Sequence, residues 1–480
     1  MRATDVLHIL GGLLLFLAGA LLLPLPVALW FDDGAAGAFL QSALISLLAG
    51  LALLKGFAGG RELGLREGFA VVSFGWLLYA LFGALPYLLS GAIPAPVDAI
   101  FETMSGFTTT GSTILSRIEP LPHSVLFWRA LTHWLGGMGI IVLSLAILPL
   151  LGVGGMQLFQ AEVPGPTADR LKPRIQDTAK LLWGVYVLLT AAEVVLLMAG
   201  GMNTFDAVCH AFATLATGGF STRDASVAAY DSAYIDAVIT LFMFLAGVNF
   251  SLHYYALRGR IDSYFRNEEF RFYLLLTGGA TLLIMLFNQG AVYTSLADNL
   301  RYSLFQVASI MTTTGFGTAD FEGWPVLSQY LLVFLMFIGG CAGSTGGGIK
   351  VARILLLLKQ SFGQLHHLIH PRRVYLVKLG NQPVPAEVLQ GILGFFALFM
   401  GVFVVASFLL AACGLDLVSA GAAVIATLGN IGPGLGSVGP VDNFGHVAPL
   451  GKMVLILCML LGRLELFTVL VLLLPSFWRR

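Results

Sequence analysis

Thr108-Thr109-Thr110-Gly111-Ser112 follows a short apolar stretch of this chain, and three related segments occur further along. They are Ala216-Thr217-Gly218-Gly219-Phe220, Thr312-Thr313-Thr314-Gly315-Phe316 and Gly429-Asn430-Ile431-Gly432-Pro433. Irregular backbone at membrane depth is tolerated only where it is buried in protein or lines a water-filled cavity. Four segments in phase, roughly 100 residues apart, therefore predict four similar hairpins around one axis, with backbone carbonyls lining a conduit for ions. The alternative, ordinary turns between helices, would suit a single segment better than four.

The composition is typical of a polytopic membrane protein. Of the 480 residues, 57% are hydrophobic and only 11% are charged, which is too few for the surface of a soluble protein. The formal net charge is zero, which argues against binding of nucleic acid, because that requires a basic surface. No phosphate-binding glycine motif or catalytic triad is evident, so we expect no enzyme activity and no cofactor bound by this chain. The cysteines lack metal-binding spacing and are expected as small buried residues: Cys209, Cys341, Cys413 and Cys458.

The apolar stretches predict the number of membrane crossings. About 20 apolar residues span a bilayer as a helix. Ten stretches meet this length: 7–30, 36–57, 69–90, 127–151, 181–200, 233–256, 271–288, 327–357, 388–413 and 447–475. Four shorter stretches are predicted to be re-entrant half-helices: 97–109, 204–217, 299–313 and 416–430. The predicted fold is therefore an all-α polytopic membrane protein with four parallel span–pore-loop–span repeats in a pseudo-fourfold arrangement, plus an extra N-terminal helix pair.

The predicted division has five parts, and the distribution of basic residues orients them. The parts are the N-terminal pair, 1–66, and the pore repeats 67–160, 161–262, 263–372 and 373–480. Positively charged short loops stay cytoplasmic, and a cytoplasmic N-terminus places every basic loop and the C-terminus on that side. Each repeat then crosses twice and starts inside, so the repeats are parallel. Many secondary transporters use inverted repeats instead, so this parity favours a channel-like pore.

The loop composition suits a dehydrated cation. Rings of backbone carbonyls replace water around an ion without a fixed charge. Glycine permits the positive φ angles that turn successive carbonyls toward one axis, and threonine hydroxyls add hydrogen bonds or ligands. The half-helices before the loops would direct their partially negative C-termini toward the pore, which favours cations.

These residues also resemble a known family. The four loops, Trp134-Leu135-Gly136-Gly137-Met138-Gly139 and Gly343-Ser344-Thr345-Gly346-Gly347-Gly348 resemble the Trk/Ktr/HKT superfamily of potassium transporters over essentially the whole chain. The extra helix pair is similar to the TrkH type of membrane subunit. The resemblance implies potassium uptake across a bacterial inner membrane, with K⁺ held by one glycine per loop and by the carbonyls before it. Those residues are Thr109, Thr110, Gly111, Thr217, Gly218, Gly219, Thr313, Thr314, Gly315, Asn430, Ile431 and Gly432.

The resemblance has further implications for partners and selectivity. It implies a homodimer in the lipid bilayer, with a cytosolic nucleotide-binding ring of the TrkA type docked on the basic inner loops. Glycine rather than serine at position 111 leans toward potassium over sodium. Asn430 and Ile431 depart from the threonine-rich pattern, so the filter cannot be fourfold symmetric, and we expect modest selectivity.

A glycine-rich break in the eighth predicted span lies below the loops. Each glycine costs about 1 kcal/mol relative to alanine in a helix interior, so 339–348 should not be a continuous helix; close helix packing is the alternative. The resemblance implies a gating loop formed by Gly343, Ser344, Thr345, Gly346, Gly347 and Gly348, with Arg463 as an electrostatic barrier to cations. A purely structural role for Arg463 stays open. Lys350 and Arg353 are expected to extend to the inner interface.

Several other polar residues lie within apolar sequence. Arg129 and His133 are expected to hydrogen-bond neighbouring loops, and Glu193 has no evident partner. Arg463 and Glu465 are two residues apart and should not pair on one helix. His366, His367 and His370 are more consistent with a solvated loop than with a metal site. Two other functions stay open. One is a K⁺ symporter coupled to H⁺ or Na⁺, in which Glu193, Glu465 or the histidines would be coupling sites, and the other is a non-conducting scaffold for a soluble partner.

Overall fold

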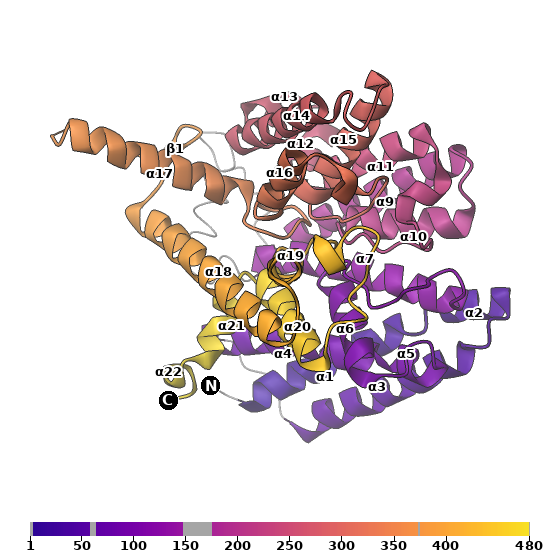
Figure 1. Cartoon of the computed structure of the whole chain (residues 1–480). Coiled ribbons are helices and arrows are strands. Elements are labelled where there is room, and N and C mark those ends of the chain that lie inside the picture. The colour runs from indigo at the N-terminus through magenta and orange to yellow at the C-terminus, as the bar shows by residue number, and fades with distance from the viewer. Residues whose placement is uncertain (1–2, 58–63, 147–174, 373–374, 480) are drawn as a thin grey trace.

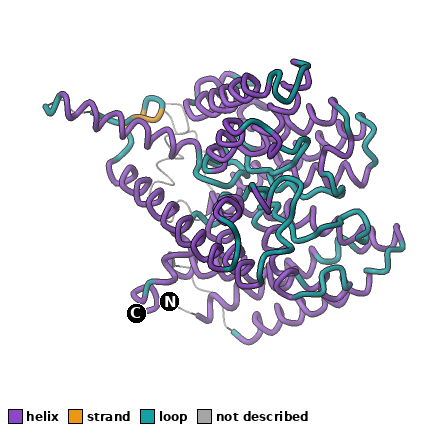
Figure 2. The backbone as a smooth tube through the Cα atoms, viewed as in Figure 1, coloured by secondary structure: helices purple, strands orange, loops and turns teal. Residues whose placement is uncertain are grey.

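The computed structural model describes residues 3–57, 64–146, 175–372 and 375–479, and almost all of its regular structure is helical (Figures 1 and 2). The first helices are α1 (Ala3–Ala20), α2 (Leu25–Phe31), α3 (Ala36–Gly56), α4 (Leu65–Gly83), α5 (Leu85–Ser90), α6 (Pro96–Phe107) and α7 (His123–Ala146). The middle of the chain forms α9 (Ile175–Ala199), α10 (Thr204–Leu215), α11 (Ala233–Ala246), α12 (Phe250–Leu257), α13 (Asp262–Arg266), α14 (Glu268–Asn288) and α15 (Leu296–Met311). The remainder forms α16 (Val326–Met336), α17 (Val351–Ile369), α18 (Ala386–Ala412), α19 (Leu417–Leu428), α20 (Pro449–Arg463), α21 (Phe467–Leu470) and α22 (Pro475–Trp478). A small hairpin joins β1 (Lys378–Leu379) to β2 (Gln382–Pro383).

The N-terminal helices α1 and α3 pack closely against each other, and α1 also packs on α4. The backbones of α1 and α3 approach each other closely at two glycines. A Cβ added to Gly11 would lie 2.8 Å from the carbonyl oxygen of Gly50, and one added to Gly50 would lie 3.0 Å from that of Gly11. Small residues at a crossing let helix backbones approach in an apolar environment, where packing rather than water drives association.

Six described helices are long and apolar enough to cross a membrane, or eight if each of two bent pairs counts as one span. The expectation of single helices over 233–256 and 447–475 is therefore wrong. The first is bent by 104° between α11 and α12, and the second by 113° between α20 and α21. At the first bend the side chain of Asn249 accepts a hydrogen bond from the Ser251 amide at 2.8 Å and begins a new helix. The predicted break between α16 and α17 is present; the end of 127–151 lies outside the described residues.

The four predicted half-helices are α6, α10, α15 and α19, with 12, 12, 16 and 12 residues. Three of them begin at a side-chain cap: Asn203, Ser295 and Asp416 each accept a hydrogen bond from a backbone amide of the first turn. α6 begins with Pro96, whose fixed φ suits the first helical position. Because they are too short to cross a bilayer, the chain reverses at their C-termini.

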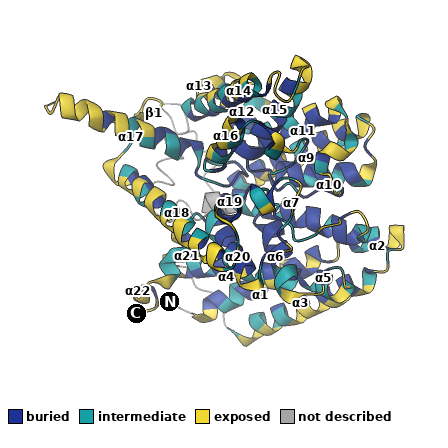
Figure 3. Ribbon diagram, viewed as in Figure 1, coloured by how far each residue is buried: buried dark blue, intermediate teal, exposed yellow. Residues whose placement is uncertain are grey.

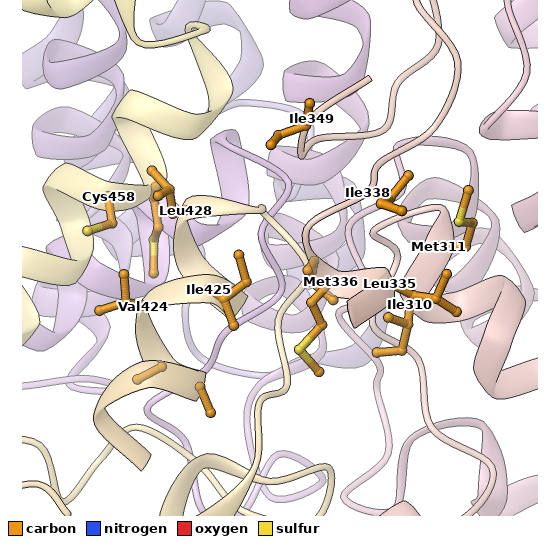
Figure 4. Packing of buried hydrophobic residues seen from close by; sticks show 14 of the residues in the cluster. Ile310, Met311, Leu335, Met336, Ile338, Ile349, Val424, Ile425, Leu428 and Cys458 are labelled. Carbon is orange, nitrogen blue, oxygen red and sulfur yellow. The ribbon is translucent and has the colours of Figure 1, made fainter. Parts of the chain in front are cut away.

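The half-helices lie in the buried centre of the molecule, whereas the long helices expose apolar faces outward (Figure 3). Figure 4 shows one part of this core, in which Leu428 of α19 lies near Cys458 of α20 and Ile425 lies toward Met336 of α16. α17 extends away from the body (Figure 1) and carries exposed apolar residues near its end. The core thus holds four helix C-termini and the loops that follow them.

Candidate ion-conducting site

Each of the four loops has the same backbone conformation at two positions. The residue two before the glycine has positive φ, with values of 51° at Thr109, 54° at Thr217, 61° at Thr313 and 54° at Asn430. The glycines follow at 80°, 79°, 82° and 106°: Gly111, Gly219, Gly315 and Gly432. Positive φ is uncommon for residues other than glycine, so four matching instances in sequence-matched loops indicate one repeated structure. The sequence predicted positive φ at the glycines but not at Thr109 and its counterparts.

The loops also meet one another in a closed circuit. A Cβ added to Gly111 would overlap the carbonyl oxygen of Gly218 in the second loop. Likewise, a Cβ on Gly219 would overlap that of Thr314, and one on Gly315 that of Ile431. A Cβ on Gly432 would lie 2.9 Å from the carbonyl oxygen of Thr110, which returns to the first loop. Each glycine therefore faces the residue that precedes the glycine of the next loop, and no side chain fits there.

Side chains behind the loops differ between repeats. In the first and third loops, pairs of threonine hydroxyls hydrogen-bond each other, Thr108 with Thr110 at 2.8 Å and Thr312 with Thr314 at 2.7 Å. The fourth loop lacks such a pair, and its Asn430 amide donates to the Thr110 hydroxyl at 2.9 Å and to the Met459 carbonyl at 3.0 Å. Asn430, which departs from the threonine-rich pattern of the other loops, thus links the fourth loop to the first by a hydrogen bond.

The segment 343–348 lies directly against the loops. The Gly347 amide donates to the Thr313 hydroxyl at 2.7 Å. The Thr345 hydroxyl is 2.9 Å from the carbonyl of Leu215, at the end of α10. A Cβ on Gly347 would lie 2.5 Å from the carbonyl oxygen of Gly429. The segment therefore touches the second, third and fourth repeats at the level where their half-helices end.

Arg463 joins this segment to the first repeat. Its guanidinium donates to the Thr345 carbonyl at 2.7 Å and to the Gly136 carbonyl at 3.2 Å. The side chain is only 2% exposed, and no acidic group pairs with it in the part of the chain that the structure describes. The sequence predicted that Arg463 lies inside a long helix. Instead, it is the last residue of α20.

A second group of charges lies beyond Arg463. As predicted, Glu465 does not pair with Arg463; it forms an ion pair with Arg353 at 2.5 Å. The Lys350 ammonium donates to the carbonyl of Gly346. Lys350 and Arg353 thus have partners within the protein, a backbone carbonyl and a carboxylate. That they extend to the inner interface stays a prediction. The bend between α20 and α21 has positive φ at both Glu465 and Leu466, 57° and 47°.

Arg129 and His133 do hydrogen-bond a neighbouring loop, as the sequence predicted. Arg129 donates to the Ser221 carbonyl at 3.2 Å, and His133 Nε2 accepts from the Phe220 amide at 3.2 Å. Sequence reasoning missed the partner of Arg129, which is Glu102 of α6 at 2.8 Å. An acidic residue within a predicted half-helix was the signal that could have identified it.

The remaining candidates are isolated. Glu193 is buried on α9 beside Thr214. His366, His367 and His370 are exposed at the end of α17. No group of three or more metal-ligating side chains occurs within the described ranges. All four cysteines are free, and three of them are buried.

Comparison with known proteins identifies the relatives of this arrangement. The family model TrkH, described as a cation transport protein, matches residues 37–479. The chain is 47% identical to the Trk system potassium uptake protein TrkH of Salmonella typhimurium, with both chains fully covered. It is 34% identical to the Trk system potassium uptake protein TrkG of Escherichia coli, covering 99% of this chain and 98% of that one. The crystal structure of the potassium transporter TrkH from Vibrio parahaemolyticus superposes with a TM-score of 0.92 at 42% identity, over the full length of both chains.

Proposed function

The chain belongs to the TrkH family of cation transport proteins, and from this premise we propose that it takes up potassium across the bacterial inner membrane. The four loops would form a pseudo-fourfold filter, each repeat contributing one glycine. The observation that carries the proposal is the closed circuit in which each glycine faces the carbonyl of the next loop. Its relatives are transport proteins rather than enzymes.

In this proposal the ligands are backbone carbonyls next to the glycines. The residues alternate between positive and negative φ over three positions of each loop, which lets successive carbonyls turn to the same side. K⁺ would then exchange its hydration shell for oxygens at Thr109, Thr110 and their counterparts in the other loops. The ion is the transported substrate, and no resident cofactor is needed. Asn430 and Ile431 make one quarter of the ring chemically different, which is consistent with modest selectivity.

The segment 343–348 and Arg463 would form the gate. The segment lies against three of the half-helix ends, so it occupies the path below the filter. The Arg463 guanidinium would add a positive charge at that point, and with no carboxylate paired to it, its repulsion of a passing cation stays uncompensated. Opening requires that the segment and Arg463 move away from the axis together, because they are hydrogen-bonded.

Control would come from partners on the cytoplasmic side. The proteins named as relatives belong to a Trk system, which supports a cytosolic nucleotide-binding ring of the TrkA type and a homodimer of this chain within the lipid bilayer. Arg258, Arg260 and Arg266 are exposed beside α13 and belong to the basic loops that we assign to the inside, together with both termini. Nucleotide would act through the ring by biasing the gate.

The experiment that tests the proposal is potassium flux into proteoliposomes, with and without the cytosolic ring. Flux that follows the potassium gradient and disappears on substitution of a filter glycine supports it. No flux under any nucleotide would support the scaffold function instead.

A second candidate, a K⁺ symporter coupled to H⁺ or Na⁺, is favoured by the buried carboxyl of Glu193, which lies among apolar residues of α9. Reversal potentials discriminate between the two mechanisms. A channel reverses at the potassium equilibrium potential alone, whereas coupling shifts the reversal potential with pH or with sodium. Glu193→Gln would abolish a pH-dependent shift if Glu193 were the coupling site.

A further inference from the structure

The residue nine positions before each filter glycine occupies the same place in every half-helix. These residues are Glu102, His210, Gln306 and Ala423, all of them buried. Three are polar, although they lie in helices whose other residues are mainly apolar or small. A buried polar side chain costs free energy unless it is hydrogen-bonded. The partners of these three side chains therefore indicate what they do.

In each of the three repeats, the partner lies on the segment that leaves the filter, a few residues after the glycine. We call this segment the outer arm. Glu102 accepts hydrogen bonds from the Thr113 hydroxyl at 2.9 Å and from the Ile114 amide at 3.1 Å. His210 Nδ1 lies 2.8 Å from its own helix at the Asp206 carbonyl, which leaves Nε2 to accept from the Ser221 hydroxyl at 2.9 Å. Gln306 donates to the Ala319 carbonyl at 3.1 Å.

The fourth repeat achieves the same proximity without a polar side chain. Its outer arm begins with Pro433, and a Cβ added to Gly434 would lie 3.0 Å from the Ala422 carbonyl oxygen of α19. Ala423, the next residue of the helix, is fully buried. Proline and close packing restrict this arm, whereas hydrogen bonds restrict the other three.

The first repeat has the strongest attachment. Glu102 and Arg129 form an ion pair with side chains 0% and 1% exposed, and Arg129 also reaches the Ser221 carbonyl. The guanidinium lies 4.1 Å from the centre of the Phe220 ring. Glu102 therefore holds the outer arm of its own loop and, through Arg129, that of the second loop. Charge-assisted hydrogen bonds are roughly twice as strong as neutral ones.

We propose that Glu102, His210 and Gln306 are positioning residues for cation selectivity: each fixes the outer arm of its loop, and thereby the spacing of the carbonyls around the filter glycine. The inference rests on the proposed role of these loops as the filter. Each outer arm follows its filter glycine within a few residues, so displacement of the arm is transmitted through the backbone to that glycine. None of the three side chains needs to contact the ion.

The test is the reversal potential of the full-length protein in proteoliposomes under opposing K⁺ and Na⁺ gradients. Gln306→Met keeps the side-chain volume and removes the hydrogen bond, and His210→Leu removes the bond to Ser221. Each should lower the ratio of K⁺ to Na⁺ permeability by about threefold or more, since one hydrogen bond corresponds to a factor of about two to ten in an equilibrium. His210→Gln, which retains an acceptor, should keep the ratio of the unmodified chain.

The matched control is Gln329→Met, because Gln329 also donates to loop carbonyls, those of Glu322 and Trp324. These residues lie seven and nine positions after Gly315, whereas the partner of Gln306 lies four positions after it. An unchanged ratio in a folded Gln306→Met or His210→Leu variant would overturn the inference. So would failure of both variants to fold, which would make the residues necessary for stability rather than for selectivity. If the unmodified chain conducts K⁺ and Na⁺ equally and Gly315→Ala changes nothing, the filter proposal itself has failed.

Discussion

Replacement of Arg463 should raise ion flux through the proposed gate. The side chain is buried and interacts with the 343–348 segment through the Thr345 carbonyl at 2.7 Å. At about 6 Å from a passing cation and with an effective dielectric constant of about 20, one positive charge costs roughly 3 kcal/mol. That corresponds to a factor of about 100 in cation occupancy. We therefore expect Arg463→Gln to raise basal potassium flux by up to about 100-fold in the absence of the cytosolic ring.

Two further substitutions separate charge from hydrogen bonding. Arg463→Lys keeps the charge and should stay closed. Arg463→Gln keeps a donor for Thr345 but removes the charge, so it should be open, as should Arg463→Ala. The control is Arg266→Gln, because Arg266 is 73% exposed and pairs with Asp262 one helical turn away. The assay is K⁺ or Rb⁺ uptake by proteoliposomes containing equal amounts of folded protein.

One pattern of results would refute the electrostatic argument. If Arg463→Gln stays closed and only Arg463→Ala leaks, the arginine acts as a structural support for the 343–348 segment. Equal, low flux in all three variants would remove Arg463 from the gate altogether.

Three other predictions follow from the same contacts. Gly315→Ala should abolish potassium-selective flux, because the φ angle of Gly315 is 82° and the added Cβ would overlap the Ile431 carbonyl oxygen. The control Gly317→Ala, which adds a Cβ in open space, should conduct normally in the same flux assay. Arg353→Met should leave Glu465 unpaired and lower the thermal midpoint of unfolding by several degrees. The double exchange Arg353→Glu with Glu465→Arg should restore part of the lost midpoint. Equal midpoints in all variants would contradict this prediction. Asn203→Ala should cost about 1 kcal/mol of stability through loss of the α10 cap, measured by chemical unfolding, whereas Asn443→Ala, in an exposed loop, should not.

Much of the site could be predicted from local sequence. Gly111, Gly219, Gly315 and Gly432 follow half-helices of the expected length, because a stretch too short to span and ended by glycine has few alternatives in a membrane. The break before α17 was also predictable, since consecutive glycines disfavour a helix. Family membership, predicted from the same motifs, is confirmed by the comparisons.

The bends at Gly247 and Glu465 were not predictable from hydropathy. The hydropathy of a stretch indicates its affinity for the bilayer, but it does not show whether the helix formed there is continuous. Gly247 lies where a Cβ would be 2.6 Å from the Tyr273 hydroxyl and 3.0 Å from the Thr312 methyl, so the constraint there comes from other parts of the chain. The partner of Arg353 was not predictable for the same reason, because Glu465 lies at the bend after α20 and reaches α17 only through tertiary packing.

The sequence by itself determined that the chain enters the membrane repeatedly, where it reverses, and that the glycines at the reversals can take positive φ. These properties depend on a residue and its near neighbours: apolar length, glycine and caps. Only the tertiary structure decided that each glycine faces the next loop, that Arg463 contacts Thr345, and that Glu102, His210 and Gln306 hold the outer arms. Those contacts join residues from different helices, and their geometry depends on the packing of all four repeats together.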